Sequence, residues 1–472
     1  MKNKERLLID PVKMPEQEPE TRIHNQKEVP LGFSLDQAKR EALRCLQCKN
    51  PKCVEDCPVN IDIPRFIGQI AEGDITAAVR TVKEKNVFPS ICGRVCPQEE
   101  QCQSRCTVGK IHKDVDKSVG IGRLERFVAD WDRAHYTENT VRVETKTGKK
   151  AAVVGSGPAG LTVAGDLAKK GHSVTVYEAL HKPGGVLIYG IPEFRLPKAI
   201  VQQEVENLEK LGVQFRYNAI IGNTFTLQEL RDEYDTVFIG TGAGLPRFLN
   251  VPGENLLGVY SANEYLTRAN LMRAYDFPNS DTPILRDERV VIVGGGNVAM
   301  DAARTARRLG AEHSMIVYRR SLDELPARKE EVHHAKEEGI EFHLLRNPVE
   351  IFGDEQGWVT GIQVIKMQLG EPDESGRRRP IPIPDSEYKI DCGIVIVAIG
   401  NRPNPLLLKE TPELQVRDKG TLQITPETGE TSIPGVFSGG DIVQGAATVI
   451  LAMGDGRKAA EAMHRYMTGE QE

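Results

Sequence analysis

Two glycine-rich turns, each between a predicted strand and a predicted helix, constrain the fold of this chain more than any other feature. They lie in KKAAVVGSGPAGLTVAGDLAKKGHSVTVYEA, at residues 149–179, and in ERVVIVGGGNVAMDAARTARRLGAEHSMIVYRR, at residues 288–320. Each segment reads as strand, glycine turn, helix and strand, which is the repeating unit of a parallel α/β sheet. We therefore expect two Rossmann-like domains that bind dinucleotides.

The first turn has the spacing G-x-G-x-x-G, formed by Gly155, Gly157 and Gly160. Glycines here let the backbone approach a pyrophosphate, which the N-terminus of the following helix then binds through its N–H groups and its dipole. Glu178 ends the second strand, where a carboxylate can bind ribose hydroxyls and would repel a 2′-phosphate. These residues predict FAD or NAD, rather than NADP, at this site.

The second turn contains Gly294, Gly296, Asn297 and Val298. Its following strand ends in Arg319 and Arg320, at the position that Glu178 has in the first segment. Two guanidinium groups there can bind the 2′-phosphate of NADP, and Arg328 is a candidate third. A solvated basic surface would give the same pattern. The simplest interpretation is FAD in the first segment and NADP(H) in the second.

A segment near the C-terminus, SGGDIVQGAATVILAMGDG, supports FAD. Its predicted strand ends at Gly440 and Asp441, which places this carboxylate near the ribityl and pyrophosphate groups of a flavin. A helix from about Ala447 would direct its N-terminal dipole at the isoalloxazine, where it would stabilise the anionic reduced flavin.

Eight of the nine cysteines lie within residues 45–106, in the groups C-x2-C-x4-C-x3-C-P and C-x3-C-P-x4-C-x3-C. Both groups contain the Cys-Pro step of bacterial ferredoxin sequences, in which the fourth cysteine binds the other cluster. Eight thiols suit two [4Fe–4S] clusters. Two four-thiolate zinc sites are the alternative. Dithiol exchange with a flavin is disfavoured, because the nucleotide-binding segments contain only Cys392.

The composition excludes several other classes of protein. A net charge of −6 argues against a nucleic-acid surface. The longest apolar runs have the length of strands, so no membrane span is expected. The N-terminus, MKNKERLLID, has no apolar signal region, which favours a cytoplasmic location.

Motifs along nearly the whole chain resemble the glutamate synthase small-subunit family. They include RCLQCKNPKC, CGRVCPQEEQC, IGRLERF, VVGSGPAGL, GGVLIYGIPEFRLPK and VIVGGGNVAMDAAR, together with the C-terminal segment quoted above. That family includes the large subunit of NADH-dependent ferredoxin:NADP oxidoreductase (the Nfn type), and the chain also resembles the N-terminal half of dihydropyrimidine dehydrogenase. The N-terminal sequence up to RCLQCKNP looks closest to the Nfn-type large subunit.

The resemblance implies an α/β protein of the glutathione-reductase type with an N-terminal all-α iron–sulfur domain. Residues 1–140 would hold two [4Fe–4S] clusters, residues 146–286 and 393–472 would bind FAD, and an inserted domain at 287–392 would bind NADP(H). The implied activity is hydride transfer from NADPH to FAD and electron transfer through the clusters, in an electron-bifurcating complex. The implied partners are ferredoxin and a small FAD/[2Fe–2S] subunit that binds NAD. The alternative is the small subunit of NADPH-dependent glutamate synthase, which would pair with that enzyme's large subunit.

The resemblance also implies roles for single residues. One cluster would be held by Cys45, Cys48, Cys53 and Cys106, and the other by Cys57, Cys96, Cys102 and Glu125. Cys92 would then be a bystander, whereas counting thiols alone gives two all-cysteine clusters. Arg195 would lie near the isoalloxazine as a catalytic cation that favours reduced flavin. The remaining predicted cofactor contacts belong to the same motifs and to two glycine turns after strands: Pro158, Ala159, Gly185, Leu187, Gly190, Ile191, Thr241, Gly242, Gly400 and Thr448.

Overall fold

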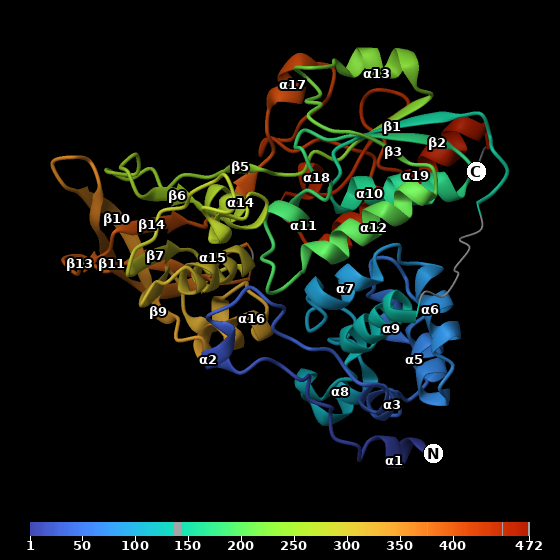
Figure 1. The fold of residues 1–472 in the computed structure, drawn as a ribbon, viewed down its shortest axis with the longest axis horizontal. Coiled ribbons are helices and arrows are strands. Elements are labelled where there is room, and N and C mark those ends of the chain that lie inside the picture. Colours follow the sequence, from blue (N-terminus) through green and yellow to red (C-terminus); the bar gives the residue numbers. More distant parts are fainter. Residues whose placement is uncertain (136–142, 375, 446, 471–472) are drawn as a thin grey trace.

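A computed structural model describes residues 1–135, 143–374, 376–445 and 447–470. The chain forms an N-terminal helical domain and two α/β domains, and the helical domain lies below the first of these and beside the second in Figure 1. Among the described residues, no helix is long and apolar enough to span a membrane.

Short helices joined by cysteine-rich loops make up the N-terminal domain. The helices are α1 (Asn3–Arg6), α2 (Pro19–Arg22), α3 (Leu35–Ala42), α4 (Lys52–Glu55), α5 (Ile63–Glu72), α6 (Ile75–Lys83), α7 (Pro89–Val95), α8 (Thr107–His112) and α9 (Ile121–His135), with a 3-10 turn, η1 (Val115–Lys117). Asp62 and Asp74 cap α5 and α6 by accepting backbone hydrogen bonds. Between them, Gly73 ends α5 with φ = +90°, a conformation that glycine adopts readily.

The first α/β domain is built on a parallel sheet with the strand order β16-β4-β1-β2-β3. Its strands are β1 (Lys150–Val154), β2 (Ser173–Tyr177), β3 (Gln214–Arg216), β4 (Thr236–Ile239) and β16 (Val436–Ser438). Its helices are α10 (Pro158–Lys169), α11 (Val186–Tyr189), α12 (Lys198–Lys210), α13 (Leu227–Glu233), α17 (Leu406–Glu410), α18 (Asp441–Gln444) and α19 (Val449–Thr468). The central strands are almost completely buried, as expected for a parallel sheet covered by helices on both faces.

The second α/β domain has a parallel sheet with the order β6-β14-β7-β8-β9. Its strands are β6 (Val259–Ser261), β7 (Arg289–Val293), β8 (His313–Tyr318), β9 (Glu341–Leu344) and β14 (Ile394–Val397), and its helices are α14 (Ala262–Asn270), α15 (Asn297–Arg308) and α16 (Lys329–Glu337), with the 3-10 turns η2 (Ala274–Asp276) and η3 (Leu322–Glu324). An antiparallel sheet packs against it, formed by β10 (Arg346–Gly353), β11 (Val359–Pro372), β12 (Arg378–Pro382) and β13 (Tyr388–Asp391).

Strand pairing corrects the predicted boundaries of the two nucleotide-binding domains. The ranges 146–286 and 393–472 assign β6 and β14 to the first domain, but both strands belong to the second sheet, where β14 pairs with β6 on one side and with β7 on the other. The chain crosses between the domains through an antiparallel pair, β5 (Leu245–Pro246) with β15 (Asn401–Arg402). The crossovers therefore lie near residues 245 and 401.

One continuous hydrophobic core joins the N-terminal domain to the first α/β domain. It includes side chains of α5, α6, α7 and α9 together with those of α10, α12 and α19. Backbones approach closely at this junction, since a Cβ added to Gly454 of α19 would lie 2.9 Å from the carbonyl oxygen of Pro58. The cysteine-rich loops are thus packed directly against the first dinucleotide-binding domain.

Candidate functional site: two dinucleotide sites beside a cysteine-rich domain

The first glycine turn connects β1 to α10, as the sequence predicts. A Cβ on Gly160 would lie 2.0 Å from the carbonyl oxygen of Gly155, so only glycine fits there. A Cβ on Gly157, which caps α10, would meet no atom within 4 Å. The N-terminus of the helix therefore faces open space, which suits a pyrophosphate.

Glu178 lies directly after β2, and its carboxylate is turned toward this glycine loop. It accepts hydrogen bonds from the backbone N–H of Ser156 at 3.0 Å, from the hydroxyl of the same serine and from the N–H of Leu180 at 2.8 Å. Thr241 follows β4, and its Cα would lie 3.3 Å from a Cβ on Gly155. The structure thus brings together the glycine loop, Glu178 and the turn that contains Thr241 and Gly242.

The C-terminal segment approaches the same loop. A Cβ on Gly440 would lie 3.2 Å from the Cβ of Ala159, and the N–H of Ala447 donates to Asp441 at 3.2 Å. Burial raises the pKa of Asp441 to about 6, partly offset by that N–H. Thr448 caps α19 by accepting from the N–H of Leu451 at 3.3 Å. The predicted flavin contacts from both ends of this domain therefore converge.

Arg195 has partners that the sequence did not reveal. Its guanidinium is buried and lies 2.6 Å from Asp301 of α15 and 2.9 Å from Glu331 of α16. The arginine thus links the first domain to the second through two carboxylates. Its role as a cation beside the flavin stays a prediction, and this pairing leaves it little net charge to offer a flavin.

Lys198, in the same GIPEFRLPK motif, is a functional candidate that the sequence reasoning missed. Its buried ammonium group donates to the carbonyl oxygens of Leu187 at 3.1 Å, Leu196 at 3.0 Å and Ile191. Burial lowers its pKa to about 8. Lys198 fixes the backbone of the segment that is predicted to face the flavin. The signal was the lysine that ends this motif.

The second glycine turn connects β7 to α15, as the first connects β1 to α10. Gly294 has φ = +147°, and a Cβ there would lie 2.3 Å from the carbonyl oxygen of Ala398, which follows β14. Gly296 caps α15. The exposed side chain of Val298 and the amide of Asn297, which accepts from the N–H of Arg328 at 2.9 Å, border this helix start.

The three arginines predicted to bind a 2′-phosphate do not form one group. Arg319 is exposed directly after β8. Arg320 is buried, donates to the carbonyl oxygen of Arg378 at 2.7 Å and is paired with Asp373. Arg328 contacts the N-terminal domain instead, through the carbonyl oxygen of Arg94 at 3.0 Å. Arg319 is therefore the best placed of the three to bind a ligand.

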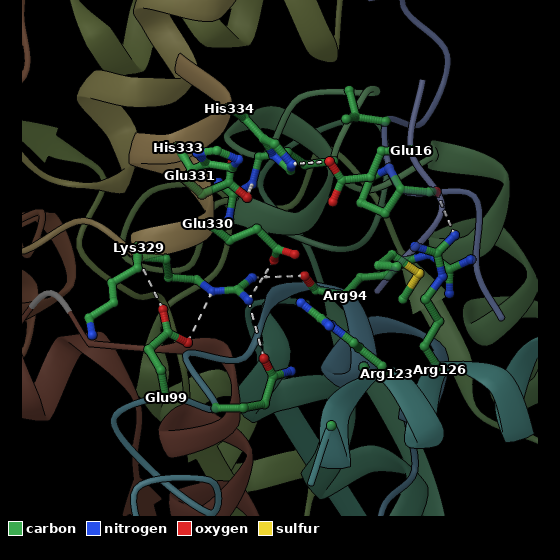
Figure 2. Close-up of a pocket in the computed structure, with 18 of the residues that line it drawn as sticks. Glu16, Arg94, Glu99, Arg123, Arg126, Lys329, Glu330, Glu331, His333 and His334 are labelled. Carbon is green, nitrogen blue, oxygen red and sulfur yellow. Dashed lines mark hydrogen bonds and ion pairs between the residues drawn. The ribbon is translucent and has the colours of Figure 1, made fainter. Parts of the chain in front are cut away.

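Arg328 lines a cavity of about 320 Å³ between the N-terminal domain and α16 (Figure 2). Charges of both signs surround this cavity, among them the carboxylates of Glu16, Glu99 and Glu330. Arg328 pairs with Glu330 at 2.9 Å, and His334 with Glu16 at 3.1 Å. The cavity is thus part of a charged contact between domains.

The eight clustered cysteines separate into two groups in space. Cys45, Cys48, Cys53 and Cys106 line one hollow. Burial, together with the charges of the neighbouring cysteines, raises the pKa of Cys45 to about 11 and that of Cys53 to about 12. All the cysteines are free thiols. The donor set of this group matches the first set that the family resemblance implies.

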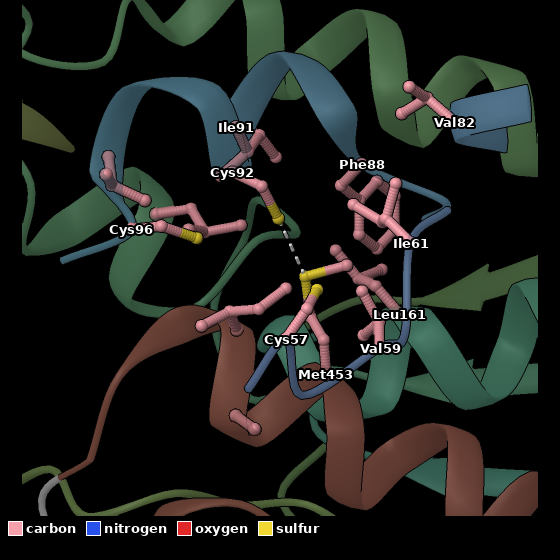
Figure 3. Close-up of a cluster of buried hydrophobic side chains, with 14 of the residues drawn as sticks. Cys57, Val59, Ile61, Val82, Phe88, Ile91, Cys92, Cys96, Leu161 and Met453 are labelled. Carbon is pink, nitrogen blue, oxygen red and sulfur yellow. Dashed lines mark hydrogen bonds between the residues drawn. The ribbon is translucent and has the colours of Figure 1, made fainter. Parts of the chain in front are cut away.

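The second group contains Cys57, Cys92, Cys96, Cys102 and Glu125. Burial raises the pKa of Glu125 to about 8, although a hydrogen bond from Asn86 at 2.7 Å opposes this shift. Burial raises the pKa values of the Cys57 and Cys102 thiols, and the hydrogen bond with Cys92, together with burial, raises that of Cys96. The charge of Glu125 adds to all three shifts. Figure 3 shows Cys92 directed toward Met453 of α19, at 3.4 Å between the sulfur atoms. Glu125 is therefore near all three of the other predicted ligands, and Cys92 is near Cys57 and Cys96.

The chain combines two dinucleotide-binding folds with a buried cysteine-rich domain, which defines an iron–sulfur flavoprotein oxidoreductase. Residues 149–456 match the family described as pyridine nucleotide-disulphide oxidoreductase, and residues 22–137 match dihydropyrimidine dehydrogenase domain II, 4Fe-4S cluster. The protein belongs to the family of the glutamate synthase small subunit and is an NAD(P)H-dependent flavin and iron–sulfur oxidoreductase.

Relatives of known function cover most of the chain. The glutamate synthase [NADPH] small chain of Halomonas elongata is 37% identical over 463 residues, which are 97% of this chain and 96% of that protein. The corresponding chain of Escherichia coli is 36% identical and covers 92% of each. The NADP(+)-dependent formate dehydrogenase subunit beta of Moorella thermoacetica is 38% identical, and this match covers 88% of the present chain and 60% of that subunit. These relatives are themselves chains or subunits of larger enzymes.

Solved structures share the fold of the nucleotide-binding part. FprA of Mycobacterium tuberculosis in complex with NADPH has a TM-score of 0.57 and 22% identity, covering 68% of this chain and 85% of that one. Thioredoxin reductase of T. acidophilum has a TM-score of 0.50 and 22% identity, covering 68% and 99%. The predicted fold class is therefore confirmed.

Proposed function

We propose that this chain oxidises NADPH at its second dinucleotide site and delivers the electrons, one at a time, to two [4Fe–4S] clusters in its N-terminal domain. FAD, when bound at the first site, supplies the exchange between a two-electron hydride and single electrons. The observation that carries the proposal is the course of α19. This helix begins two residues after Ala447, which bonds to Asp441, and it contacts Cys92 and Pro58 about 6–8 Å further along, at 1.5 Å per residue.

The residues of the chain have distinct roles in this proposal. The helix N-termini behind Gly157 and Gly296 bind the two pyrophosphates, and Glu178 binds the ribose of FAD. Arg319 binds the 2′-phosphate of NADP(H) because its guanidinium is exposed at the end of β8. Arg195 links the two domains and so sets the orientation of the nicotinamide site toward the flavin site.

Two ligand sets hold the clusters. The first consists of Cys45, Cys48, Cys53 and Cys106, and the second of Cys57, Cys96, Cys102 and Glu125. The chemistry of these donors supports iron–sulfur clusters, because both sets are rich in free thiols and lie against the nucleotide-binding domain. A carboxylate is a harder ligand than a thiolate, so the second cluster has a different potential from the first.

Two kinds of partner are candidates. The N-terminal sequence favours a small FAD/[2Fe–2S] subunit, with electron bifurcation from NADPH to ferredoxin and NAD. The match to the glutamate synthase small chain of Halomonas elongata over 96% of its length favours a large glutamate-forming subunit instead. In both cases the nucleotide sites and the clusters have the same roles.

Anaerobic purification from the native source tests both levels of this proposal. We expect NADPH to bleach the flavin and then to produce the electron paramagnetic resonance (EPR) signals of reduced clusters. A co-purified flavin and [2Fe–2S] subunit supports the bifurcating complex, and a large amidotransferase supports glutamate synthase. A chain that contains zinc, or whose flavin NADPH does not reduce, contradicts the proposal.

A further inference from the structure

We propose that Arg378 is a specificity-determining residue of the second dinucleotide site, because it neutralises a carboxylate, Glu324, that would otherwise repel the 2′-phosphate of NADP(H). This inference rests on the assignment of NADP(H) to that site in the proposed function. It gives a role to the paired antiparallel strands β11 and β12, which lie outside both nucleotide-binding motifs.

Glu324 places a carboxylate at the end of β8. Its Oε2 accepts a hydrogen bond from the backbone N–H of Ser321 at 3.2 Å and another from the hydroxyl of the same serine. The chain after Glu324 packs against the second glycine turn, since a Cβ on Gly295 would lie 2.7 Å from Cδ2 of Leu325. The carboxylate is therefore at the strand end where this kind of fold binds the 2′ group of a ribose.

The first α/β domain has a carboxylate at the corresponding place. Leu180 is the third residue after β2, as Ser321 is the third residue after β8, and the N–H of Leu180 donates to Glu178 at 2.8 Å. Corresponding backbone N–H groups thus bind a carboxylate in both domains. Such a carboxylate favours a ribose hydroxyl and repels a 2′-phosphate. Without compensation, Glu324 would give the second site the same preference as the first.

The compensating cation comes from β12. Nε of Arg378 donates to Oε1 of Glu324 at 2.5 Å. The side chain of Glu324 is 7% exposed and that of Arg378 is 47% exposed, so the guanidinium covers the carboxylate on its solvent side. With Ser321 bonded to the other oxygen, both oxygens of Glu324 are occupied. Arg378 thus cancels the negative charge that a 2′-phosphate would meet.

Arg320 holds this part of the second domain in place. Its Nε donates to the backbone carbonyl oxygen of Arg378 at 2.7 Å, and its guanidinium pairs with Asp373, which directly follows β11. Neither contact uses the side chain of Arg378. The two arginines after β8 therefore divide the work: Arg319 is exposed to the phosphate, and Arg320 positions the strand that supplies Arg378.

Two other roles for Arg378 compete with this one. A purely structural ion pair is the first, but a half-exposed pair contributes little to stability. Direct contact between Arg378 and the phosphate is the second. A double substitution separates direct contact from neutralisation. If Arg378 acts by neutralising Glu324, it becomes dispensable once Glu324 has lost its charge, whereas a direct contact is lost in either background.

The experiment uses the full chain loaded with FAD, in the variants Arg378→Gln, Glu324→Gln, both together, and Arg379→Gln. The probes are 2′,5′-ADP and 5′-AMP, which differ only in the 2′-phosphate, and calorimetric titration gives their affinities. Arg379→Gln is the matched control, because Arg379 is the next residue of β12, is exposed and points to the opposite face.

We expect Arg378→Gln to weaken the binding of 2′,5′-ADP by about tenfold or more and that of 5′-AMP by less than about twofold. The double variant should recover to within about threefold of the parent chain, and Glu324→Gln and Arg379→Gln should resemble it. In kinetics with an artificial electron acceptor, Arg378→Gln should raise the KM for NADPH and keep kcat. Arg378→Lys, which keeps the charge, should restore most of the affinity.

A double variant that binds 2′,5′-ADP as weakly as Arg378→Gln would overturn the inference and leave the NADP(H) assignment intact. Unchanged affinity in Arg378→Gln would do the same. A parent chain that binds 5′-AMP as tightly as 2′,5′-ADP would contradict the NADP(H) assignment itself. If Arg378→Gln does not fold, the double variant is compared with Glu324→Gln, since neither retains the carboxylate. Neutralisation then requires equal affinities for 2′,5′-ADP, and weaker binding by the double variant contradicts it.

Discussion

Gly157 and Gly160 lie in one turn but are glycine for different reasons. A Cβ at position 160 would collide with the backbone of Gly155, whereas a Cβ at position 157 would enter open space. We expect Gly157→Ala to keep the melting temperature of the FAD-free protein while its FAD content falls several-fold. Gly160→Ala should destabilise the FAD-free protein itself, by about 1–3 kcal/mol. Thermal melts and flavin absorbance measure the two effects. An equal decrease in the melting temperature of both FAD-free variants would contradict this distinction.

Arg319 and Arg320 are adjacent, but only Arg319 has an exposed guanidinium. We expect Arg319→Ala to raise the KM for NADPH by about tenfold, the effect of losing roughly 1.4 kcal/mol of phosphate binding, with little change for NADH. Steady-state kinetics with an artificial electron acceptor and both nucleotides give the comparison. Arg308→Lys, in a buried pair with Glu338, is unsuitable as a control. Lys329→Ala removes the cation at the first position of α16 and should affect both nucleotides equally.

Many of the site residues could be predicted from sequence because their roles depend on local geometry. The glycine turns and Glu178 each follow a strand that short-range patterns reveal. The partners of Arg195 and Arg328 could not be predicted in this way, since Asp301, Glu331 and Arg94 are distant in sequence and no periodicity relates them. The hydrogen bond from Asn86 to Glu125 joins residues 39 positions apart, and the sequence did not reveal it for the same reason.

At the scale of elements, α19 is the closest link between the two halves of the candidate electron path. Gly454 has no room for a side chain against Pro58. We expect Gly454→Val to separate α19 from the loop that carries Cys57, so that NADPH still reduces the flavin but the clusters are reduced more than tenfold more slowly. Stopped-flow absorbance measures both steps. Leu451→Ala, at an exposed position of the same helix, should behave as the parent chain.

The elements themselves were largely predictable, but the membership of one strand was not. CGIVIVAIG forms a strand, as its apolar run predicts, yet β14 lies in the second sheet rather than in the first. An apolar run specifies a buried strand without specifying its neighbours. The antiparallel strands β10–β13 were not anticipated either, because their partly exposed pattern is less distinct than that of the parallel strands.

At the scale of the whole molecule, a buried network of ion pairs joins all three domains. Arg22 of the N-terminal arm donates a hydrogen bond to Glu338 at 2.8 Å. Arg304 and Arg308 of α15 also donate to this carboxylate, at 2.9–3.0 Å. Arg304 also pairs with Glu331, which holds Arg195. In Figure 1, α2 accordingly lies beside α16. The network fixes the second α/β domain against the rest of the protein.

This network predicts how stability depends on pH. Burial alone would raise the pKa of Glu338, but Arg304 and Arg308 outweigh it and hold this pKa far below its usual range. The unfolded chain, with a pKa of about 4.3, then binds more protons than the folded one in acid. The contribution of Glu338 to the free energy of unfolding is therefore fully present above about pH 5, and it decreases as the pH drops through about 4. Urea unfolding at several pH values between 7 and 4 measures how steeply the free energy of unfolding falls with pH.

Glu338→Gln is the variant that checks the origin of this slope. We expect the free energy of unfolding to fall by about 3–5 kcal/mol at pH 7, because buried guanidinium groups lose their partner. In acid, the free energy of unfolding of this variant should decline less steeply than that of the parent chain. Glu341→Gln, which changes an exposed carboxylate on β9, is the control and should leave the stability at pH 7 nearly unchanged. If the free energy of unfolding of Glu338→Gln falls with pH as steeply as that of the parent chain, groups other than Glu338 cause the acid sensitivity.

The Arg22 contact also affects the order in which a newly made chain can assemble. The N-terminal arm leaves the ribosome first, but Glu338 follows 316 residues later. Domains generally fold in order as they are synthesised, and contacts between distant residues form late. The cysteine-rich domain must therefore wait, with its arm unattached, until α16 has been translated. The arm can close onto α16 before either nucleotide-binding domain is complete, because β14, β16 and α19 follow later in the chain.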